Sequence, residues 1–179
     1  MRSRRWCAVA ASIVLAASCT FDYGPGEQEQ SPRRPNIEAF DARLEIERDG
    51  RLEISVERLA TFRDEGLQEL DGLTVREFGP DGNLRLEGSA DAARIYLDSD
   101  NVELIGRVVL RSLEEDAELR SEFLFWDDQN RVLSSGDAPT VELLRGDESW
   151  VRGDSLRLDA RRNAAVLSGA VSGRYRETE

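Results

Sequence analysis

Residues 42–57 have the sequence ARLEIERDGRLEISVE, in which apolar and polar side chains alternate on both sides of Asp49-Gly50. A period of two residues places the apolar side chains on one face of a β-strand and the charged ones on the other. Asp-Gly between two such runs is a strong hairpin signal, because these residues tolerate the positive φ angles of a tight turn. The stretch therefore predicts an antiparallel hairpin with one apolar face and one solvated face.

The same pattern continues toward the C-terminus. Short runs with a period of two residues recur as far as Val171, and turn-forming segments such as 80–83 and 127–130 separate them. About a dozen short strands, with turn signals roughly every 8–12 residues, are typical of an all-β sandwich, barrel or jelly roll. Only residues 59–66 leave a strand and a short helical turn equally open. We therefore expect one all-β domain over residues 37–179.

Two segments of this domain resemble each other. Residues 88–108 and 153–171 each begin with a glycine, continue through a strand, a polar turn and a second strand, and end with Gly-x-Val. A hairpin of this size cannot bury its apolar face alone and must stack on its neighbours. The similarity favours a jelly roll that is built from stacked hairpins.

The composition excludes several classes of function. The chain has 179 residues, 40% of them hydrophobic, and a formal net charge of -12, and its positive side chains are all arginine. This acidity argues against binding to nucleic acid and against electrostatic docking on an anionic bilayer. The chain has no histidine, and its two cysteines, Cys7 and Cys19, precede the expected domain. A disulfide framework, a cysteine-based zinc site and a histidine general base are therefore excluded for residues 37–179.

The many carboxylates predict a solvated surface rather than chemistry. Two acids whose carboxyl groups lie roughly 5–10 Å apart are enough for glycoside hydrolysis. Here, however, the acids fall at the polar positions of alternating strands. The clusters at 98–100 and 114–116 do not match a calcium-binding EF-hand loop and are typical of plain turns. We expect no enzymatic activity, no metal and no cofactor.

Residues 1–18 have the features of a signal peptide. A charged start is followed by an apolar run over residues 6–17, which is too short to span a bilayer that needs roughly 20 residues. Residues 15–18, Leu-Ala-Ala-Ser, precede Cys19 and resemble a bacterial lipobox, which implies cleavage before Cys19 and a lipid on its side chain. An ordinary cleaved signal or a short uncleaved anchor are the alternatives.

A flexible linker is expected between Cys19 and residue 36. The segment is polar, is interrupted by several glycines and prolines, and shows no apolar period. A coil of this length spans roughly 20–25 Å. The linker would hold the β-domain clear of the membrane surface.

Over residues 40–176 the chain resembles the LptC family, the periplasmic component of lipopolysaccharide export, and the related LptA and OstA-like domains. The resemblance depends on the order and spacing of these segments: 70–75 (LDGLTV), Gly82, 88–92 (GSADA), 104–108 (LIGRV), 124–127 (LFWD), 132–135 (VLSS), 138–141 (APTV), 153–156 (GDSL) and 167–171 (LSGAV). It implies a twisted, partly open antiparallel β-jelly roll with an apolar lumen.

The resemblance also implies a function. A periplasmic lipoprotein of this kind would bind the lipid A acyl chains of lipopolysaccharide or a related glycolipid. It would receive them from an inner-membrane ABC transporter and pass them toward the outer membrane through an LptA-like bridge, by pairing of edge strands. The best-known members have an N-terminal transmembrane helix, which the lipid on Cys19 would replace here. We expect anchoring in the inner rather than the outer membrane, although Thr20, where an aspartate would favour inner-membrane retention, does not assure it.

The residues expected to line the lumen are the apolar positions of the alternating strands. They are Ile46, Ile54, Val56, Leu84, Leu86, Ile95, Leu97, Leu104, Val108, Leu110, Phe123, Phe125, Leu156, Leu158, Leu167 and Val171. A closed core needs the same residue types, so a structural or adhesive outer-membrane lipoprotein with a sealed β-sandwich stays open as the alternative. The segment 123–126 is apolar on both faces, which suits a lumen-lining strand and a central buried strand equally.

Overall fold

The computed structural model describes residues 33–47, 50–136, 140–146, 149–162 and 164–176. Its contacts separate residues 34–179 from the preceding part of the chain, and all the described strands lie in this unit. The expected signal peptide at 1–18, the lipidated Cys19 and nearly all of the linker lie outside the described residues.

The described chain forms twelve strands in one sheet, and every neighbouring pair is antiparallel. The expectation of an all-β fold is therefore confirmed. In chain order the elements are β1 (Ile37–Glu47), β2 (Arg51–Phe62), the 3-10 turn η1 (Arg63–Glu65), β3 (Leu67–Phe78), β4 (Leu84–Tyr96), β5 (Asn101–Ser112), β6 (Ala117–Asp127), β7 (Val132–Ser134), β8 (Val141–Arg145), β9 (Ser149–Gly153), β10 (Ser155–Asp159), β11 (Ala164–Ser168) and β12 (Ser172–Arg174).

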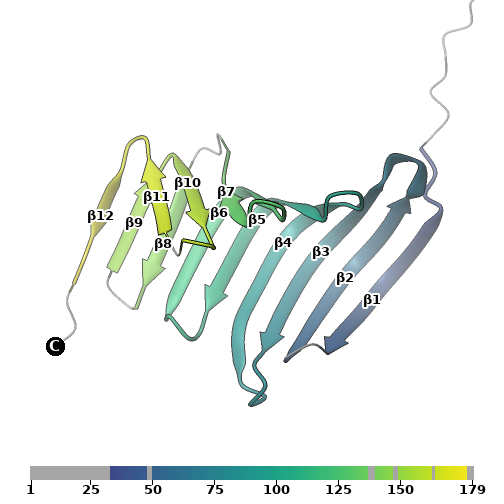
Figure 1. Ribbon diagram of the computed structural model, residues 1–179, viewed down its shortest axis with the longest axis horizontal. Helices are drawn as coiled ribbons and strands as arrows, with labels where there is room; N and C mark the ends of the chain where they lie inside the picture. The colour runs from purple at the N-terminus through teal and green to yellow at the C-terminus, as the bar shows by residue number, and fades with distance from the viewer. Residues whose placement is uncertain (1–32, 48–49, 137–139, 147–148, 163, 177–179) are drawn as a thin grey trace, which may run out of the picture. The chain divides into compact units, whose positions relative to one another are not determined.

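Strands β1 to β6 form a meander in which each strand pairs with the next along the chain (Figure 1). The antiparallel hairpin expected at 42–57 is present, and its register places Leu44 opposite Ile54. These six strands have 11 to 13 residues each, so they are longer than the short strands expected from sequence. Gly88, the first residue of the repeat segment 88–108, lies within β4 and not at the start of a strand. The ambiguous stretch 59–66 contains both alternatives, strand as far as Phe62 and then η1.

The sheet divides at β6. The segment 117–121 of β6 pairs with β8, whereas 125–127 pairs with β7. The β8 leaf, as we call it, consists of β8, β9 and β12, and the β7 leaf consists of β7, β10 and β11. The two leaves share one apolar core, to which Val141 of β8 and Leu156 of β10 both belong. The two leaves therefore pack against each other over this core.

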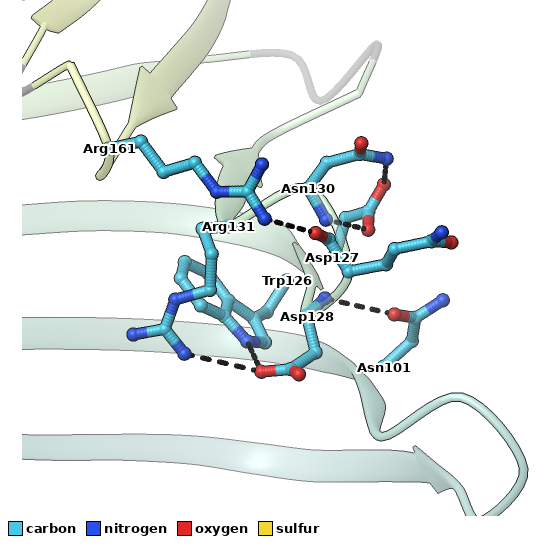
Figure 2. Close-up of polar contacts among 8 residues, drawn as sticks. Asn101, Trp126, Asp127, Asp128, Asn130, Arg131 and Arg161 are labelled. Atoms are coloured by element: carbon cyan, nitrogen blue, oxygen red, sulfur yellow. Dashed lines mark hydrogen bonds and ion pairs between the residues drawn. The ribbon is translucent and has the colours of Figure 1, made fainter.

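The β6–β7 turn holds the β7 leaf in place (Figure 2). Asn130 donates from its backbone N–H and its side-chain amide to the two carboxylate oxygens of Asp127, at 2.9 and 2.7 Å. Arg131 has a left-handed backbone with φ of 56°. The guanidinium of Arg161, in the β10–β11 turn, donates to the carbonyl oxygen of Gln129 at 2.7 Å. The polar segment that predicted a turn thus also links two hairpins.

Candidate functional site

One line of interruptions crosses the strands β1 to β6. Along this line the Cα pairing omits at least one level, for example one between the pairs Asp71–Ala92 and Leu73–Ala90 and two between Ser55–Thr74 and Arg58–Asp71. The irregularity on β5 is a bulge, in which two residues oppose Glu122 of β6. We call this line the crease, and its residues are Asp41, Glu57, Gly72, Asp91, Gly106, Arg107 and Glu122.

The crease combines left-handed backbone with acidic side chains. Asp41, Gly72 and Gly106 on alternate strands have φ of 50°, 63° and 88°, which is the region that glycine adopts most easily. The carboxylate of Asp91 accepts the backbone N–H of Arg107 at 3.0 Å and its guanidinium at 2.9 Å. These hydrogen bonds lower the pKa of the Asp91 carboxyl below its usual range. Asp91 therefore satisfies a backbone donor that the bulge removes from the sheet.

The same arrangement recurs near the C-terminus. Gly169 has φ of 87°, and the carboxylate of Asp154 accepts the N–H of the next residue, Ala170, at 2.7 Å. The acid precedes the glycine by fifteen positions here, as it does for Asp91 and Gly106. This acid–glycine pair is the structural basis of the internal repeat. The glycines mark the repeat in the sequence, whereas the pairing of each glycine with a distant acid is visible only in the structure.

The crease changes which side chains share the apolar face. Strict alternation would place residues three apart on opposite faces, but across the crease they lie on the same face. Leu70 and Leu73 on β3 are both buried, at 5% and 7% exposure, in one hydrophobic cluster. On β4 the corresponding residues are Ala90 and Ala93, which are also buried. The apolar side chains nearest the crease therefore form the core of the meander.

The apolar face has a closed end between the two leaves. Leu124 of β6 and Val141 of β8 are completely buried there, and Val108 and Leu156 are nearly so. These residues form the C-terminal cluster, which Leu104 joins to the cluster of the meander. At this end the apolar residues fill an ordinary core.

The apolar face has an open end at β1. Leu44 and Ile46 alternate with charged residues on this strand and lie on the apolar face, yet they are 55% and 42% exposed. Among the described strands, β1 pairs only with β2, so its outer edge has free backbone groups. Apolar surface and unpaired strand edge thus coincide at one end of the sheet.

The structure brings together most of the residues expected to line a lumen. Ile54, Val56 and Ile95 belong to the cluster of the meander, and Val108, Leu110, Leu156 and Leu167 belong to the C-terminal cluster. Leu104 contacts both clusters, and Ile46 lies at the open end. The remaining positions on β4 and β10, Leu84, Leu86 and Leu158, are half-buried outside the clusters.

Four of the expected residues lie elsewhere. Phe123 and Phe125 flank Leu124, and since Leu124 points into the core, their side chains lie on the opposite face of β6. Leu97 and Val171 are 45% and 51% exposed and lie outside the strands. The segment 123–126 is thus part of a central strand, with Leu124 as its core residue.

Comparison with known proteins assigns the chain to a family. The family model described as "Lipopolysaccharide-assembly, LptC-related" matches residues 7–176. The chain belongs to the LptC family. LptH from Pseudomonas aeruginosa, the LptA-homologous periplasmic component of the lipopolysaccharide transport device, has a similar fold. Its TM-score is 0.56 at 8% identity, and the match covers 70% of this chain and 95% of LptH. No curated protein matches the sequence.

These findings confirm the LptC resemblance and the partly open β-jelly roll. Membership of the LptC family places the protein in lipopolysaccharide transport in the periplasmic part of the cell envelope, and not among enzymes. Within the described ranges, no helix has the length and hydrophobicity to cross a membrane.

Proposed function

We propose that this LptC-family protein binds the acyl chains of lipopolysaccharide on its apolar face and passes them on. The observation that carries the proposal is the open end at β1, where exposed apolar side chains continue into a buried cluster. Acyl chains entering there would cover Leu44 and Ile46 and extend the apolar core. Each methylene group that leaves water contributes about 0.8 kcal/mol, so a few chains suffice for tight binding.

We further propose that two of the sheet's terminal strands, β1 and β12, contact different partners. Strand β1 has one free edge among the described strands, and β12 at the opposite end pairs only with β9. Free strand edges recruit strands of other proteins through backbone hydrogen bonds. In this model an inner-membrane ABC transporter delivers the glycolipid, and an LptA-like bridge protein pairs with the segment from Val171 to Tyr175.

A lipid on Cys19 would keep the protein at the inner membrane. The proposal is based on the lipobox-like residues 15–18 and the polar linker that follows. Replacement of Cys19 by alanine is expected to abolish incorporation of radiolabelled palmitate and to release a soluble or unprocessed form. Undiminished labelling of the Cys19→Ala protein would exclude this anchor.

Photo-crosslinking in cells tests the lipid proposal directly. A photoreactive amino acid at Leu44 is expected to crosslink to lipopolysaccharide, because Leu44 lies at the open end of the apolar face. The matched control is Phe40, which is 65% exposed on the same strand but belongs to the charged face. Equal crosslinking from both positions would contradict the proposal.

The alternative function is a structural or adhesive outer-membrane lipoprotein. The observation that favours it is the closed C-terminal cluster, where Leu124 and Val141 leave no apolar surface exposed. Absence of lipid crosslinks at both Leu44 and Ile46, in a protein that is stably folded, would favour this alternative.

A further inference from the structure

The charged face of the meander contains a trough that runs across the strands. Ser55, Thr74, Ser89 and Val109 are successive register partners on β2, β3, β4 and β5. Their side chains are short, whereas the neighbouring levels of the same face contain mainly arginine and glutamate. A row of short side chains between rows of long ones leaves a hollow whose floor consists of three hydroxyl-bearing residues and one valine.

The largest part of the trough lies over β1, β2 and β3. It has a volume of about 480 Å³, and its polar lining consists of Arg43, Glu45, Glu53, Ser55, Thr74 and Arg76. A second hollow of about 210 Å³ shares Thr74 and Arg76 with it and extends the trough toward β5. Hydrogen-bond donors therefore line both the floor and the walls.

The two carboxylates of this hollow have a cationic partner. Arg51 places its Nε atom 3.2 Å from Glu53 and 3.8 Å from Glu45. The guanidinium carbon of Arg51 also lies 4.3 Å from the centre of the Phe78 ring, which fixes this side chain near the two acids. Arg51 thus balances much of the negative charge of the lining.

The acidic cross-strand neighbours of Arg76 form ion pairs with other arginines. Arg76 lies opposite Glu53 on β2 and opposite Glu87 on β4. Glu53 pairs with Arg51, and Glu87 pairs with Arg111 at 3.6 Å. In the described part of the chain, neither Arg76 nor Arg43 forms an ion pair with another residue. Two arginines that have no anionic partner among the described residues therefore line one hollow in a protein of net charge -12.

We propose that this part of the trough is a binding site for the phosphate group of a polar ligand. A phosphate accepts paired hydrogen bonds from the planar guanidinium of arginine, and nearby hydroxyls add further donors. Arg43 and Arg76 supply the charge, and Ser55 and Thr74 supply the hydroxyls. The ligand chemistry is that of a phosphorylated sugar or of free phosphate. The four side chains project from the charged face, whereas Leu44, which also borders the hollow, alternates to the apolar face, so the site does not depend on acyl-chain binding.

The test is an NMR titration of the full-length protein with glucose 6-phosphate, inorganic phosphate and glucose. The variant R43Q/R76Q is expected to raise the Kd for glucose 6-phosphate at least tenfold. The control R145Q/R162Q removes two exposed arginines from other parts of the surface and is expected to leave the Kd within twofold. Thermal unfolding of both variants checks that they remain folded. The variant S55A/T74V, which removes the hydroxyls without any change of charge, is expected to raise the Kd by a smaller factor than R43Q/R76Q.

Three results would overturn the proposal. They are an unchanged Kd in R43Q/R76Q, an equal loss in the control variant, and binding of glucose as tight as that of glucose 6-phosphate. The titrations with glucose 6-phosphate and with inorganic phosphate together identify the source of the ligand. Tighter binding of glucose 6-phosphate assigns the site to a phosphorylated sugar, and equal binding of inorganic phosphate assigns it to the free anion. An Ile46→Glu variant that loses lipid but retains phosphate binding would separate the two faces, because Ile46 lies at the open end but does not border the hollow.

Discussion

Gly106 and Asp91 illustrate how single residues form the crease. The left-handed backbone of Gly106 strains any other residue, and a Cβ atom there would lie 2.6 Å from Cβ of Asp91. Gly106→Ala is therefore expected to lower the free energy of unfolding by about 2–4 kcal/mol, from backbone strain and overpacking together. Urea denaturation measures this loss.

Gly82→Ala is the matched control for this substitution. Gly82 has a similar φ of 79°, but no atom lies within 4 Å of its would-be Cβ. Only the cost of the left-handed backbone applies, which is roughly 1 kcal/mol. Equal losses in the two variants would mean that the contact with Asp91 contributes nothing.

The depressed pKa of Asp91 predicts a pH dependence. Because the folded pKa lies below the unfolded one, ionised Asp91 stabilises the fold above about pH 4, and this contribution is lost as the pH falls through the folded pKa. Asp91→Asn is expected to be less stable near neutral pH and to lose less stability on acidification. Melting temperatures between about pH 6 and 2.5 check this, and parallel curves for the two proteins would contradict it.

Trp126 and Asp128 show why the sequence predicted turns well but not their contacts. The run 127–130 identified the turn, because Asp and Asn tolerate turn conformations. In the structure the indole Nε1 of Trp126 donates to Asp128 at 3.1 Å, and Arg131 lies over the Trp126 ring (Figure 2). The carboxylate of Asp128 also accepts a hydrogen bond from the guanidinium of Arg131. Such contacts depend on side-chain geometry that composition does not encode.

At the scale of the strands, alternation predicted the element type and one antiparallel hairpin, but it did not locate the crease. A bulge shifts the face of every later residue, and only a glycine with a distant acid marks it in the sequence. The segment 123–126 is a second case. It is apolar on both faces, so a period of two residues cannot tell that Leu124 rather than Phe123 points into the core.

Strand β12 makes the edge-pairing proposal testable. A proline at Ser172 removes a backbone donor from an exposed strand of three residues. We expect Ser172→Pro to abolish co-purification with an LptA-like partner and to lower the melting temperature by only a few degrees. Ser172→Ala keeps the N–H group and is expected to retain the partner. Unimpaired co-purification of the proline variant would assign the contact to another edge.

At the scale of the whole β-unit, the open and closed ends predict opposite effects of one substitution. A carboxylate at Leu44 meets water when the face is empty and hydrocarbon when lipid is bound. Leu44→Glu is therefore expected to weaken lipopolysaccharide binding roughly ten- to a hundredfold with little change in melting temperature. At Leu124, which is completely buried, the same substitution is expected to unfold the protein.

Thermal unfolding and lipopolysaccharide binding on the same two variants distinguish a lipid-binding face from a sealed core. Phe40→Glu, on the charged face of β1, controls for the added charge and is expected to change neither quantity. If Leu44→Glu unfolds the protein, then Leu44 is part of a closed core, and the structural lipoprotein becomes the better interpretation.

The crease has a mechanical consequence for the cargo. Along this line the backbone pairing is already interrupted, and Asp91 replaces one missing partner with a side-chain contact. Bending along the crease would therefore cost fewer backbone hydrogen bonds than bending elsewhere in the sheet. If the apolar face binds lipid as proposed, we expect the crease to be the line along which the groove widens or narrows around glycolipids with different numbers of acyl chains.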